Sequence, residues 1–300
     1  MEYTIFGRTN AKVSKLGLGG APLAGDFGDT DEREIERMIH CALDLGINFI
    51  DTAPLYGRGQ SEKRIGKALQ GGKREKVFLS SKAARSDLAY TYATTIQSVE
   101  DSLIRLSTDW IDLLHIHDVE TQPLSLIMEE TLPALERLRD EGKIRFIAAS
   151  SHNLSLLSSL METGRFDSIQ FYGRYMLMDY TAKEETIPLA RSMNIGVVNG
   201  SVLGMGLLAD QPAKFLNSDQ VEKAQARMEK LAFLRHGSEG GLIEAAMRFS
   251  LGNPDIHVTL TGTATVQTLL QNASYCDGAA LPEEQLQRIY ELFPGMKFAE

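Results

Sequence analysis

The sequence predicts one (β/α)8 barrel, a TIM barrel, that spans residues 1–300 as a single domain. From Leu16 onward, eight short apolar stretches alternate with helical stretches, and this alternation favours parallel pairing of the strands. The length of 300 residues suits one such barrel, and no repeat, low-complexity segment or linker rich in proline and serine divides the chain. An open, doubly wound sheet is the alternative arrangement of the same elements.

The amino-terminal elements are predicted from weak alternation and from glycine. Residues 3–16 alternate weakly in polarity, which predicts a small hairpin. A strand then begins at Leu16 and runs into the glycine-rich segment 17–22. This segment does not match a dinucleotide-binding fingerprint, because the third glycine of the GxGxxG pattern would fall at Pro22. We expect its glycines to allow close approach of the backbone to a ligand or to a neighbouring strand.

The helices and the remaining strands follow from caps, terminators and apolar periodicity. Thr30 or Asp31 can begin a helix that ends at Gly46, and Ser61 can begin one that ends before Gly71. Further helices are predicted at 91–106, 125–140, 155–162, 182–193 and 240–251, with two extra carboxyl-terminal helices at 265–274 and 282–293. Strands are predicted at 47–51, 77–81, 110–114, 144–149, 168–171, 196–199 and 257–260.

Two polar stretches are expected on the surface. A long insertion between residues 203 and 240 contains a polar helix near 219–235. The basic residues Lys73, Arg74 and Lys76 are predicted to lie in a solvated loop.

Composition narrows the class of protein. A formal net charge of −9 argues against binding to nucleic acid or to an anionic membrane surface. No apolar stretch is long enough to span a membrane, and the start of the chain does not look like a signal peptide. Cys41 and Cys276 form no CxxC motif, so we expect reduced thiols in a cytoplasmic protein.

The stretch from Gly46 to Gly57 combines a buried strand with reactive side chains. Its apolar residues end at Asp51, and Pro54 then forces a loop that presents Tyr56. In a parallel barrel, the carboxyl ends of the strands carry the active site. A carboxylate and a phenol at this place therefore predict a catalytic site. The structural alternative is that Asp51 starts a turn and Tyr56 packs over the barrel mouth.

Further polar residues follow the other predicted strands. They are Lys82 after the third, His115 and His117 at the fourth, Ser150, Ser151 and Asn153 after the fifth, Gln170 at the sixth, and Asn199 and Ser201 at the seventh. A buried Asp and a buried Lys are costly unless they pair. A lysine beside Tyr56 would lower the pKa of the phenol and make it a proton donor and acceptor near neutral pH. Such a set suits interconversion of a carbonyl and an alcohol, which also needs a hydride carrier.

With these residues in these places, the sequence resembles the aldo-keto reductase superfamily over nearly the whole chain. The resemblance is carried by five ordered segments, at 46–56, 61–66, 112–117, 141–145 and 203–208. It implies a catalytic tetrad of Asp51, Tyr56, Lys82 and His117. Tyr56 would be the general acid and base, Lys82 its activator, Asp51 the partner of Lys82, and His117 the group that orients the substrate oxygen.

The resemblance also implies a nicotinamide cofactor bound in extended form at the barrel mouth. The Ser-Asn pair that holds the carboxamide falls on Ser150 and Ser151, so the amide side chain is replaced, whereas Gln170 is retained. The aromatic residue that stacks on the nicotinamide falls near Gly200, so another residue such as Tyr172 would have to supply the stacking. The other candidate cofactor-binding residues are Gly20, Asn199, Ser201, Leu203, Gly206, Gly262, Thr263, Thr268, Gln271 and Asn272.

The segment expected to hold the adenosine end of the cofactor favours NAD over NADP. Relatives that use NADP carry Lys or Arg in the segment 261–272, and here Gly262, Ala264 and Thr268 occupy those places. A 2′-phosphate without a cationic partner would gain little. Gln271 and Asn272 remain to bind adenine.

Within the superfamily, two short segments of the sequence are most similar to the sugar dehydrogenase branch. This branch includes L-galactose, L-fucose and D-threo-aldose 1-dehydrogenases, with the pyridoxal 4-dehydrogenases beside them, and segments 115–120 and 130–135 carry the likeness. The implied activity is NAD-linked oxidation of an aldose or similar polyhydroxy substrate, with a small-molecule carbonyl or sugar as ligand.

Three alternative functions remain open at the level of the sequence. The chain could be an NADPH-dependent reductase of small aldehydes, or a nucleotide-binding barrel that regulates without catalysing. It could also be a metal-dependent barrel hydrolase, because His115 and His117 share a strand face and could bind a metal together with Asp51 and His152. Against the hydrolase, His257 lies at the wrong end of its strand, and we expect no metal. Packing or hydrogen bonding around the site is the simpler role for His115.

Overall fold

Eight parallel strands close into a barrel in the computed structural model, which describes residues 1–25, 27–83, 88–235 and 240–293. The strand order is β10-β3-β4-β5-β6-β7-β8-β9, and β10 pairs with both β3 and β9. The predicted (β/α)8 barrel is therefore confirmed and the open sheet is wrong. The barrel strands are β3 (Leu16–Gly19), β4 (Phe49–Asp51), β5 (Phe78–Ala83), β6 (Ile111–Ile116), β7 (Ile144–Ser150), β8 (Ser168–Tyr172), β9 (Gly196–Gly200) and β10 (Val258–Gly262).

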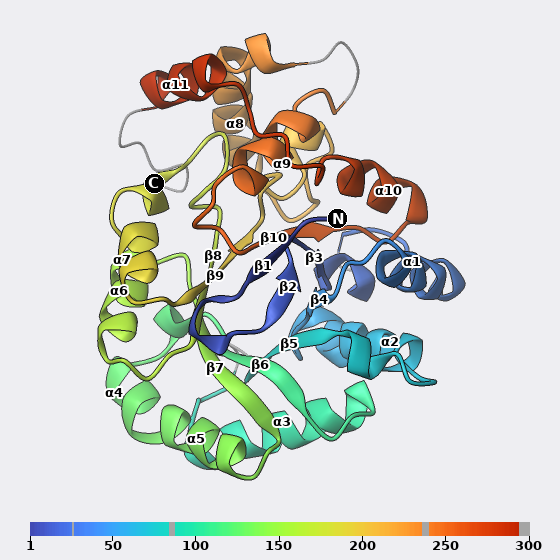
Figure 1. The fold of residues 1–300 in the computed structure, drawn as a ribbon, viewed down its shortest axis with the longest axis vertical. Coiled ribbons are helices and arrows are strands. Elements are labelled where there is room, and N and C mark those ends of the chain that lie inside the picture. The colour runs from blue at the N-terminus through green and yellow to red at the C-terminus, as the bar shows by residue number, and fades with distance from the viewer. Residues whose placement is uncertain (26, 84–87, 236–239, 294–300) are drawn as a thin grey trace.

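Helices surround the barrel (Figure 1). Asp31 caps the first of them, since its side chain accepts a hydrogen bond from the Glu34 N–H, as the sequence predicts. The helix predicted at 125–140 is in fact α4 and α5 joined by one π-helical turn, Ile127–Thr131. The helices are α1 (Glu32–Asp44), α2 (Gln60–Ala68), α3 (Tyr92–Leu106), α4 (Leu124–Leu126), α5 (Leu132–Asp140), α6 (Leu154–Glu162), α7 (Thr186–Ser192), α8 (Ser218–Lys230), α9 (Ile243–Leu251), α10 (Val266–Ser274) and α11 (Glu283–Leu292).

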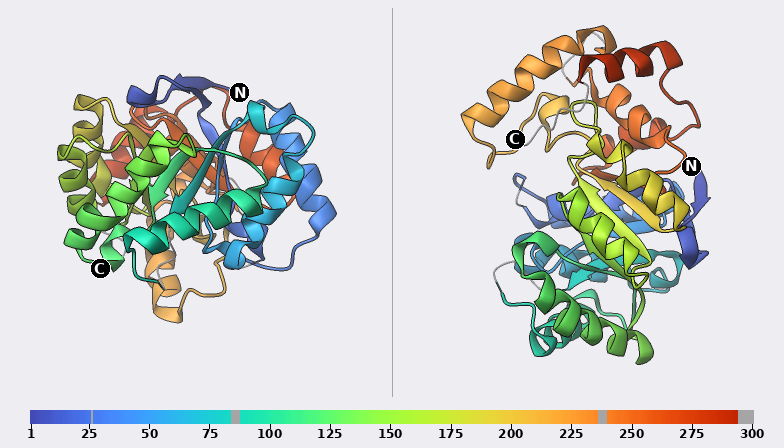
Figure 2. Two further views of the ribbon diagram at one scale, coloured as in Figure 1. Left: turned by 90° about the horizontal axis from the view of Figure 1, so that it is seen from below. Right: turned by 90° about the vertical axis from the view of Figure 1, so that its left-hand side faces the viewer.

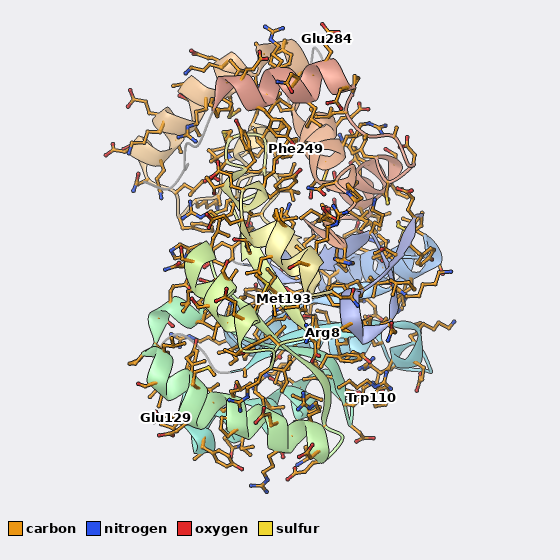
Figure 3. The ribbon with its side chains drawn as sticks, turned by 60° about the vertical axis from the view of Figure 1, so that its left-hand side comes forward. Arg8, Trp110, Glu129, Met193, Phe249 and Glu284 are labelled. Carbon is orange, nitrogen blue, oxygen red and sulfur yellow. The ribbon has the colours of Figure 1, made fainter. Side chains whose placement is uncertain are left out.

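The predicted hairpin closes the amino end of the barrel. Strands β1 (Tyr3–Ile5) and β2 (Lys12–Ser14) pair antiparallel, and the hairpin crosses the barrel end in Figure 1. Between them, Phe6 is fully buried and packs edge-to-face against Phe49, with ring centroids 5.8 Å apart. Arg8 Nη2 donates to the Met193 carbonyl at 2.6 Å, so the hairpin is also tied to the end of α7 (Figure 3).

The inward-facing residues change from apolar to polar along the strands. Successive inward positions are two residues apart, so Phe49 is followed by Asp51 and Leu113 by His115. The apolar members form one inner cluster at the amino end, namely Phe6, Val13, Phe49, Leu113, Ala148, Val198, Val258 and Leu260. The outward-facing residues pack against the helices in a second, larger cluster. This gradient leaves buried polar side chains at the carboxyl end of the barrel.

The insertion after β9 lies at the opposite end from the hairpin (Figure 2). Its helix α8 begins at a capping box in which Asn217 and Gln220 bond each other's backbone N–H groups. The predicted helix was too long, since α8 ends at Lys230; residues 236–239 of the insertion lie outside the described residues. Phe215 of the insertion contacts Phe27, in the loop after β3, edge-to-face at 5.4 Å.

Two local predictions are wrong because tertiary contacts decide them. Ser61 does not cap α2, since it is fully buried and donates to the Gly20 carbonyl at 2.8 Å. Gly59, with φ of +86°, takes the cap position. Arg74 is not in a solvated loop, since it is buried and forms an ion pair with Asp112 at 2.8 Å.

No helix within the described ranges is long and apolar enough to cross a membrane. The thiols of Cys41 and Cys276 are both free, as the sequence predicts.

Candidate active site

A buried ion pair joins the inner faces of β4 and β5. Lys82 Nζ donates to Asp51 Oδ2 at 2.7 Å and to the Thr52 carbonyl at 2.9 Å, and each charged side chain is 2% exposed. Ser80 Oγ donates to Asp51 Oδ1 at 2.8 Å, which satisfies the second carboxylate oxygen. Burial by itself would lower the pKa of Lys82, but Asp51 and Tyr56 together raise it above its ordinary value. Lys82 is thus held as a cation, and it lies inside β5 rather than after it.

Tyr56 approaches this pair from the loop after β4. The loop turns back sharply because Gly57 and Arg58 both adopt left-handed backbone conformations, with φ of +54° and +52°. Lys82 Nζ lies 5.0 Å from the centroid of the Tyr56 ring. Burial raises the pKa of Tyr56, and the charge and hydrogen bond of Lys82 lower it only in part. Lys82 lowers the pKa of Tyr56 as predicted, but desolvation outweighs this effect, so the pKa lies above its ordinary value and not near neutral pH.

His117 faces Tyr56 from the end of β6. The two rings pack edge-to-face, with centroids 6.1 Å apart and an interplanar angle of 88°. Burial, followed by the charge of Lys82, lowers the pKa of His117 well below its ordinary value, so the imidazole is neutral at pH 7. Nε2 lies 3.6 Å from Asp118 Oδ2, and Nδ1 has no hydrogen-bond partner in the described part of the chain.

His115 lies one inward step deeper on the same strand. It pairs in register with Lys82, and burial lowers its pKa to about 4. Neither ring nitrogen has a hydrogen-bond partner among the described residues, so packing describes this residue better than hydrogen bonding. The same residues hold no group of three or more His, Cys, Asp and Glu side chains that could bind a metal ion, which leaves the hydrolase alternative without a ligand set.

The candidate cofactor residues at the ends of β7 to β9 are partly engaged with the protein. Ser150 Oγ accepts from the Asp118 N–H at 3.1 Å, and Ser151 Oγ donates to Glu120 Oε2 at 2.6 Å. Asn199 is buried and donates from Nδ2 to the Tyr175 carbonyl and to Ser250 Oγ. Gln170 is also buried, and its Oε1, like Asn199 Oδ1, has no partner within the ranges described.

The glycines of this group serve the backbone. A Cβ at Gly20 would lie 2.8 Å from the Asp51 carbonyl oxygen, so this glycine allows close approach to the neighbouring strand. A Cβ at Gly206 would lie 2.0 Å from the Gln211 carbonyl oxygen, and Gly206 has φ of +87°. Ser201 also has a positive φ, of +56°, and Leu203 is half-buried in the same turn region.

The segment after β10 forms the amino-terminal end of α10. Gly262 is exposed, whereas Thr263 is buried and its Oγ1 accepts from the Thr265 N–H at 3.2 Å. Thr268 is half-buried and its N–H donates to Thr265 Oγ1 at 3.3 Å.

The two amides predicted to bind adenine are not equivalent. Asn272 is buried and donates from Nδ2 to Thr261 Oγ1 at 2.6 Å, whereas Gln271 is exposed. Gln271 is therefore the better placed of the two for contact with a ligand.

The comparisons with known proteins agree with this geometry. The model of the Aldo/keto reductase family matches residues 15–293. This chain belongs to the aldo/keto reductase family. Among its relatives, it is 33% identical over 282 residues to an L-galactose dehydrogenase of Arabidopsis thaliana, covering 91% of this chain and 88% of that one. It is 30% identical over 293 residues to a D-threo-aldose 1-dehydrogenase of Pseudomonas sp, covering 88% and 89%.

A solved structure supports the same conclusion. The aldo-keto reductase AKR11C1 from Bacillus halodurans, in its holo form, superposes with a TM-score of 0.81 at 26% identity, covering 100% of this chain and 99% of that one. The resemblance predicted from the sequence motifs is thus confirmed, and the protein is an NAD(P)-dependent oxidoreductase.

Sequence reasoning missed a polar network at the mouth of this aldo/keto reductase. Tyr172 Oη donates toward Asp118 Oδ1 at 3.2 Å and toward Glu120 Oε1 at 3.3 Å, and His152 Nδ1 lies 2.5 Å from Glu120 Oε1. The residues come from the ends of β6, β7 and β8, so only closure of the barrel brings them together. Tyr172, expected to stack on a nicotinamide, uses its hydroxyl in this network.

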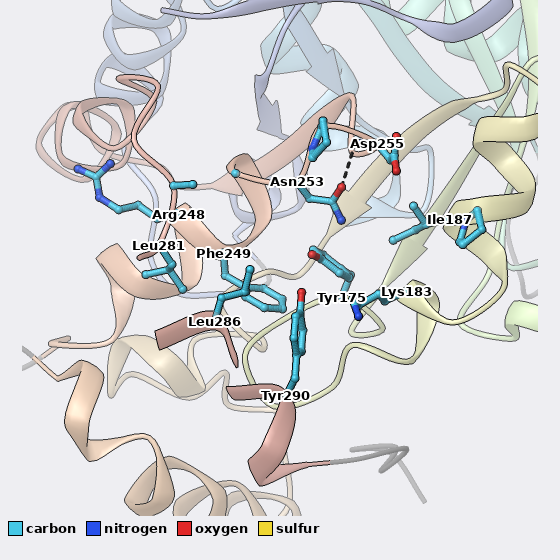
Figure 4. A pocket seen from close by; sticks show the side chains of 14 residues that line it. Tyr175, Lys183, Ile187, Arg248, Phe249, Asn253, Asp255, Leu281, Leu286 and Tyr290 are labelled. Carbon is cyan, nitrogen blue, oxygen red and sulfur yellow. Dashed lines mark hydrogen bonds between the residues drawn. The ribbon is translucent and has the colours of Figure 1, made fainter. Parts of the chain in front are cut away.

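A cavity of about 280 Å³ lies away from the predicted tetrad, between α7, α9 and α11. Tyr175, Phe249 and Tyr290 supply its aromatic wall, with Lys183 and Asp255 at its edge (Figure 4). None of the four tetrad residues lines it. We place the chemistry at the strand ends, because a buried ion pair, a phenol and an imidazole converge there.

Proposed function

We propose that this aldo/keto reductase catalyses the NAD-linked oxidation of an aldose or a similar polyhydroxy compound. The observation that carries the proposal is the convergence of Asp51, Lys82, Tyr56 and His117 at the carboxyl ends of the neighbouring strands β4, β5 and β6. The relatives named for L-galactose and D-threo-aldoses support a sugar as the substrate. A relative named pyridoxal 4-dehydrogenase, 26% identical, makes pyridoxal the compound to test beside the sugars.

Each residue of the tetrad has a role that follows from its surroundings. Tyr56 takes the proton of the substrate hydroxyl as a phenolate, which the charge of Lys82 stabilises, and becomes the neutral phenol. Asp51 keeps Lys82 charged in spite of its burial. Neutral His117 can donate one hydrogen bond to the substrate oxygen without placing a second cation beside Lys82.

The residues at the ends of β7 and β8 fit a nicotinamide cofactor. Gln170 Oε1 is a buried acceptor with no partner in the described ranges, and a carboxamide N–H would satisfy it. Ser151 lies beside it, since its N–H donates to the Gln170 carbonyl at 3.1 Å. When bound, the cofactor supplies the site that accepts or returns the hydride.

A carboxylate at the amino-terminal end of α10 supports NAD in preference to NADP. Glu34 Oε1 accepts a hydrogen bond from the Val266 N–H at 3.0 Å, and this bond lowers the pKa of Glu34. The nearby Arg37 is paired with Glu34 at 2.5 Å. A 2′-phosphate at this helix end would meet a negative charge where it needs a positive one.

The activity is tested by a screen of aldoses, pyridoxal and simple aldehydes with NAD and NADP in both directions, followed by the absorbance of the reduced nicotinamide. We expect the fastest turnover for oxidation of an aldose with NAD. Rapid reduction of simple aldehydes with NADPH would contradict the proposal and favour a small-aldehyde reductase.

The role of Tyr56 is tested with the variant Tyr56→Phe. We expect a loss of turnover of about 10²- to 10⁴-fold, with cofactor affinity retained, since only the hydroxyl is removed. The matched control is Tyr3→Phe, which removes a hydroxyl bonded to the Gly46 carbonyl at the other end of the barrel. Unchanged oxidation by Tyr56→Phe would refute the assignment, and binding without turnover in the wild type would indicate a regulatory protein.

The cofactor preference is tested by titrating NAD and NADP against the wild type and the variant Glu34→Gln. We expect tighter binding of NAD by the wild type, and a gain in NADP affinity for the variant. Tighter binding of NADP by the wild type would overturn this part of the proposal.

A further inference from the structure

The network beside His117 connects the predicted catalytic centre to the surface. Asp118 follows His117 directly, Tyr172 bridges Asp118 and Glu120, and Glu120 contacts His152. The path begins at a buried side chain and ends at an exposed one, since His117 is 5% exposed, Asp118 and Glu120 are 21% and 15% exposed, and His152 is 49% exposed. We propose that these residues form a proton relay, which carries the proton released in alcohol oxidation from the catalytic centre to solvent at His152; this inference rests on the proposed function.

The reaction requires a path of this kind. Oxidation of an alcohol to a carbonyl breaks one C–H bond, whose hydride goes to the cofactor, and one O–H bond, whose proton goes to Tyr56. Tyr56 must lose that proton before the next turnover. Because burial raises the pKa of Tyr56, direct loss of the proton to water is unfavourable. A chain of groups that accept and donate in turn gives the proton a faster route to solvent, while the equilibrium for its loss stays the same.

His117 can pass the proton on in one exchange. Once the product has left and no longer accepts the N–H of His117, Nδ1, which has no partner in the described part of the chain, can accept a proton while the Nε2–H is released to Asp118. Two links of the path are not hydrogen bonds in this structure. Tyr56 and His117 meet ring to ring, with centroids 6.1 Å apart and no hydrogen bond to Nδ1 among the described residues, and His117 Nε2 lies 3.6 Å from Asp118 Oδ2. A movement of about 0.5 Å brings the second link to hydrogen-bond length. Asp118 is suited to accept, because burial and the charge of Glu120 raise its pKa.

The position of Asp118 is held by its surroundings. Its backbone is left-handed, with φ of +42°, a strained conformation for a residue other than glycine. Ser150 Oγ accepts its N–H at 3.1 Å and fixes that conformation. As a result the carboxylate points toward both His117 and Tyr172.

From Asp118 the proton reaches the surface through a shared hydroxyl. Tyr172 Oη donates toward Glu120 Oε1 at 3.3 Å while accepting a proton from the Asp118 side, and it lies 3.2 Å from His152 Nδ1. Glu120 then passes the proton to His152, whose Nδ1 lies 2.5 Å away. Each transfer breaks one O–H or N–H bond and forms the next, so no other reactant is needed.

The charged groups that face the path are few within the described residues. Lys82 and His115 lie on the inner side, and the charge of Lys82 acts on both His117 and Asp118. On the outer side, Arg174 Nε donates to the His152 carbonyl at 2.9 Å, and the Arg174 guanidinium is paired with Asp179. Ser151 Oγ donates to the second oxygen of Glu120.

The test uses Tyr172→Phe, which removes only the hydroxyl at the centre of the path, with Tyr3→Phe as the matched control. Oxidation of the fastest aldose from the screen is followed at pH 7 while the concentration of imidazole is raised. We expect the kcat of Tyr172→Phe to fall at least about fivefold, less than for loss of a direct acid–base group, and to recover as imidazole takes over proton removal. The solvent deuterium isotope effect on kcat should rise in the same variant.

Two results would overturn the relay. The first is a kcat and isotope effect for Tyr172→Phe that match the wild type. The second is a loss of kcat that imidazole does not restore, since that would indicate a packing role. Glu120→Gln provides a second break in the same path and should show the same rescue if Tyr172→Phe folds poorly. If Tyr56→Phe retains full activity, both the proposed function and the relay are refuted. If Tyr56→Phe loses its activity while Tyr172→Phe behaves like the wild type, only the relay is refuted.

Discussion

Two buried aspartates on the barrel strands have similar environments and different consequences. Asp51, at the carboxyl end of β4, pairs with Lys82, and Asp112, at the amino end of β6, pairs with Arg74. Each carboxylate is 2% exposed, and each oxygen of both accepts a hydrogen bond. Burial of an ion pair is therefore common to both ends of the barrel.

The cations differ in what they have left to donate. Arg74 uses all three guanidinium nitrogens within the protein, on Thr108 Oγ1, on the Val77 carbonyl, and on the Trp110 carbonyl together with Asp112. Lys82 donates to Asp51 and to Thr52, and an ammonium has three donors, so one remains for Tyr56. Lys82 thus keeps part of its hydrogen-bonding capacity for Tyr56, whereas every guanidinium nitrogen of Arg74 is used within the protein.

The variant Asp51→Asn, which removes the ion pair at the carboxyl end of the barrel, should have the largest effect. Without Asp51, burial lowers the pKa of Lys82, so the phenol loses its neighbouring charge. We expect oxidation per folded molecule to fall by about 100-fold or more, as for loss of a general acid–base function. Steady-state kinetics on protein whose folding has been checked by circular dichroism would measure this. A kcat near that of the wild type would show that the charge of Lys82 does not depend on Asp51.

The variant Asp112→Asn should act on stability and not on turnover. It leaves Arg74 buried without its counterion, which costs about 3–5 kcal/mol. Chemical denaturation would measure the loss, and the kcat of the folded fraction should stay within about twofold of the wild type, because no reacting group is touched. A large fall in kcat would mean that the two ends of the barrel are coupled.

The pH dependence of stability should show the effect of burying neutral His115 at the carboxyl end of the barrel. Its pKa is about 4 in the folded protein and its ordinary value is 6.5, so the unfolded chain takes up a proton first as the pH falls. Stability supported by neutral His115 is present above pH 6.5 and is lost between pH 6.5 and pH 4. We expect His115→Gln to reduce the fall in melting temperature over this window. An equal fall in both proteins would place the acid sensitivity elsewhere.

Arg145 should give the smallest effect. Its Nη1 lies 2.7 Å from Asp112 Oδ1, but its side chain is 58% exposed, whereas that of Arg74 is 9% exposed. Water screens the outer pair, so we expect Arg145→Ala to cost about 1 kcal/mol or less in the free energy of unfolding. A cost equal to that of Asp112→Asn would show that the outer arginine, and not the inner one, holds the carboxylate.

The sequence by itself predicted the barrel, which the structure confirms, and the four residues that we propose as the tetrad. Periods of two and of 3.6 residues are local, so they place most strands and helices within a few residues, and charged or phenolic side chains at the ends of apolar strands stand out without any structure. Parallel closure then brings Asp51, Lys82 and His117 to one end, because all carboxyl ends meet there.

Only the tertiary structure decided how each group behaves once it is there. Arg74 looks like a surface residue until Asp112 is placed beside it, and Ser61 looks like a cap until Gly20 packs against it. The direction of the Tyr56 pKa shift, and the path from Asp118 to His152, depend on burial and on distances between residues far apart in the chain. Local sequence patterns carry neither quantity, because desolvation and hydrogen bonding between strands arise only when the barrel closes.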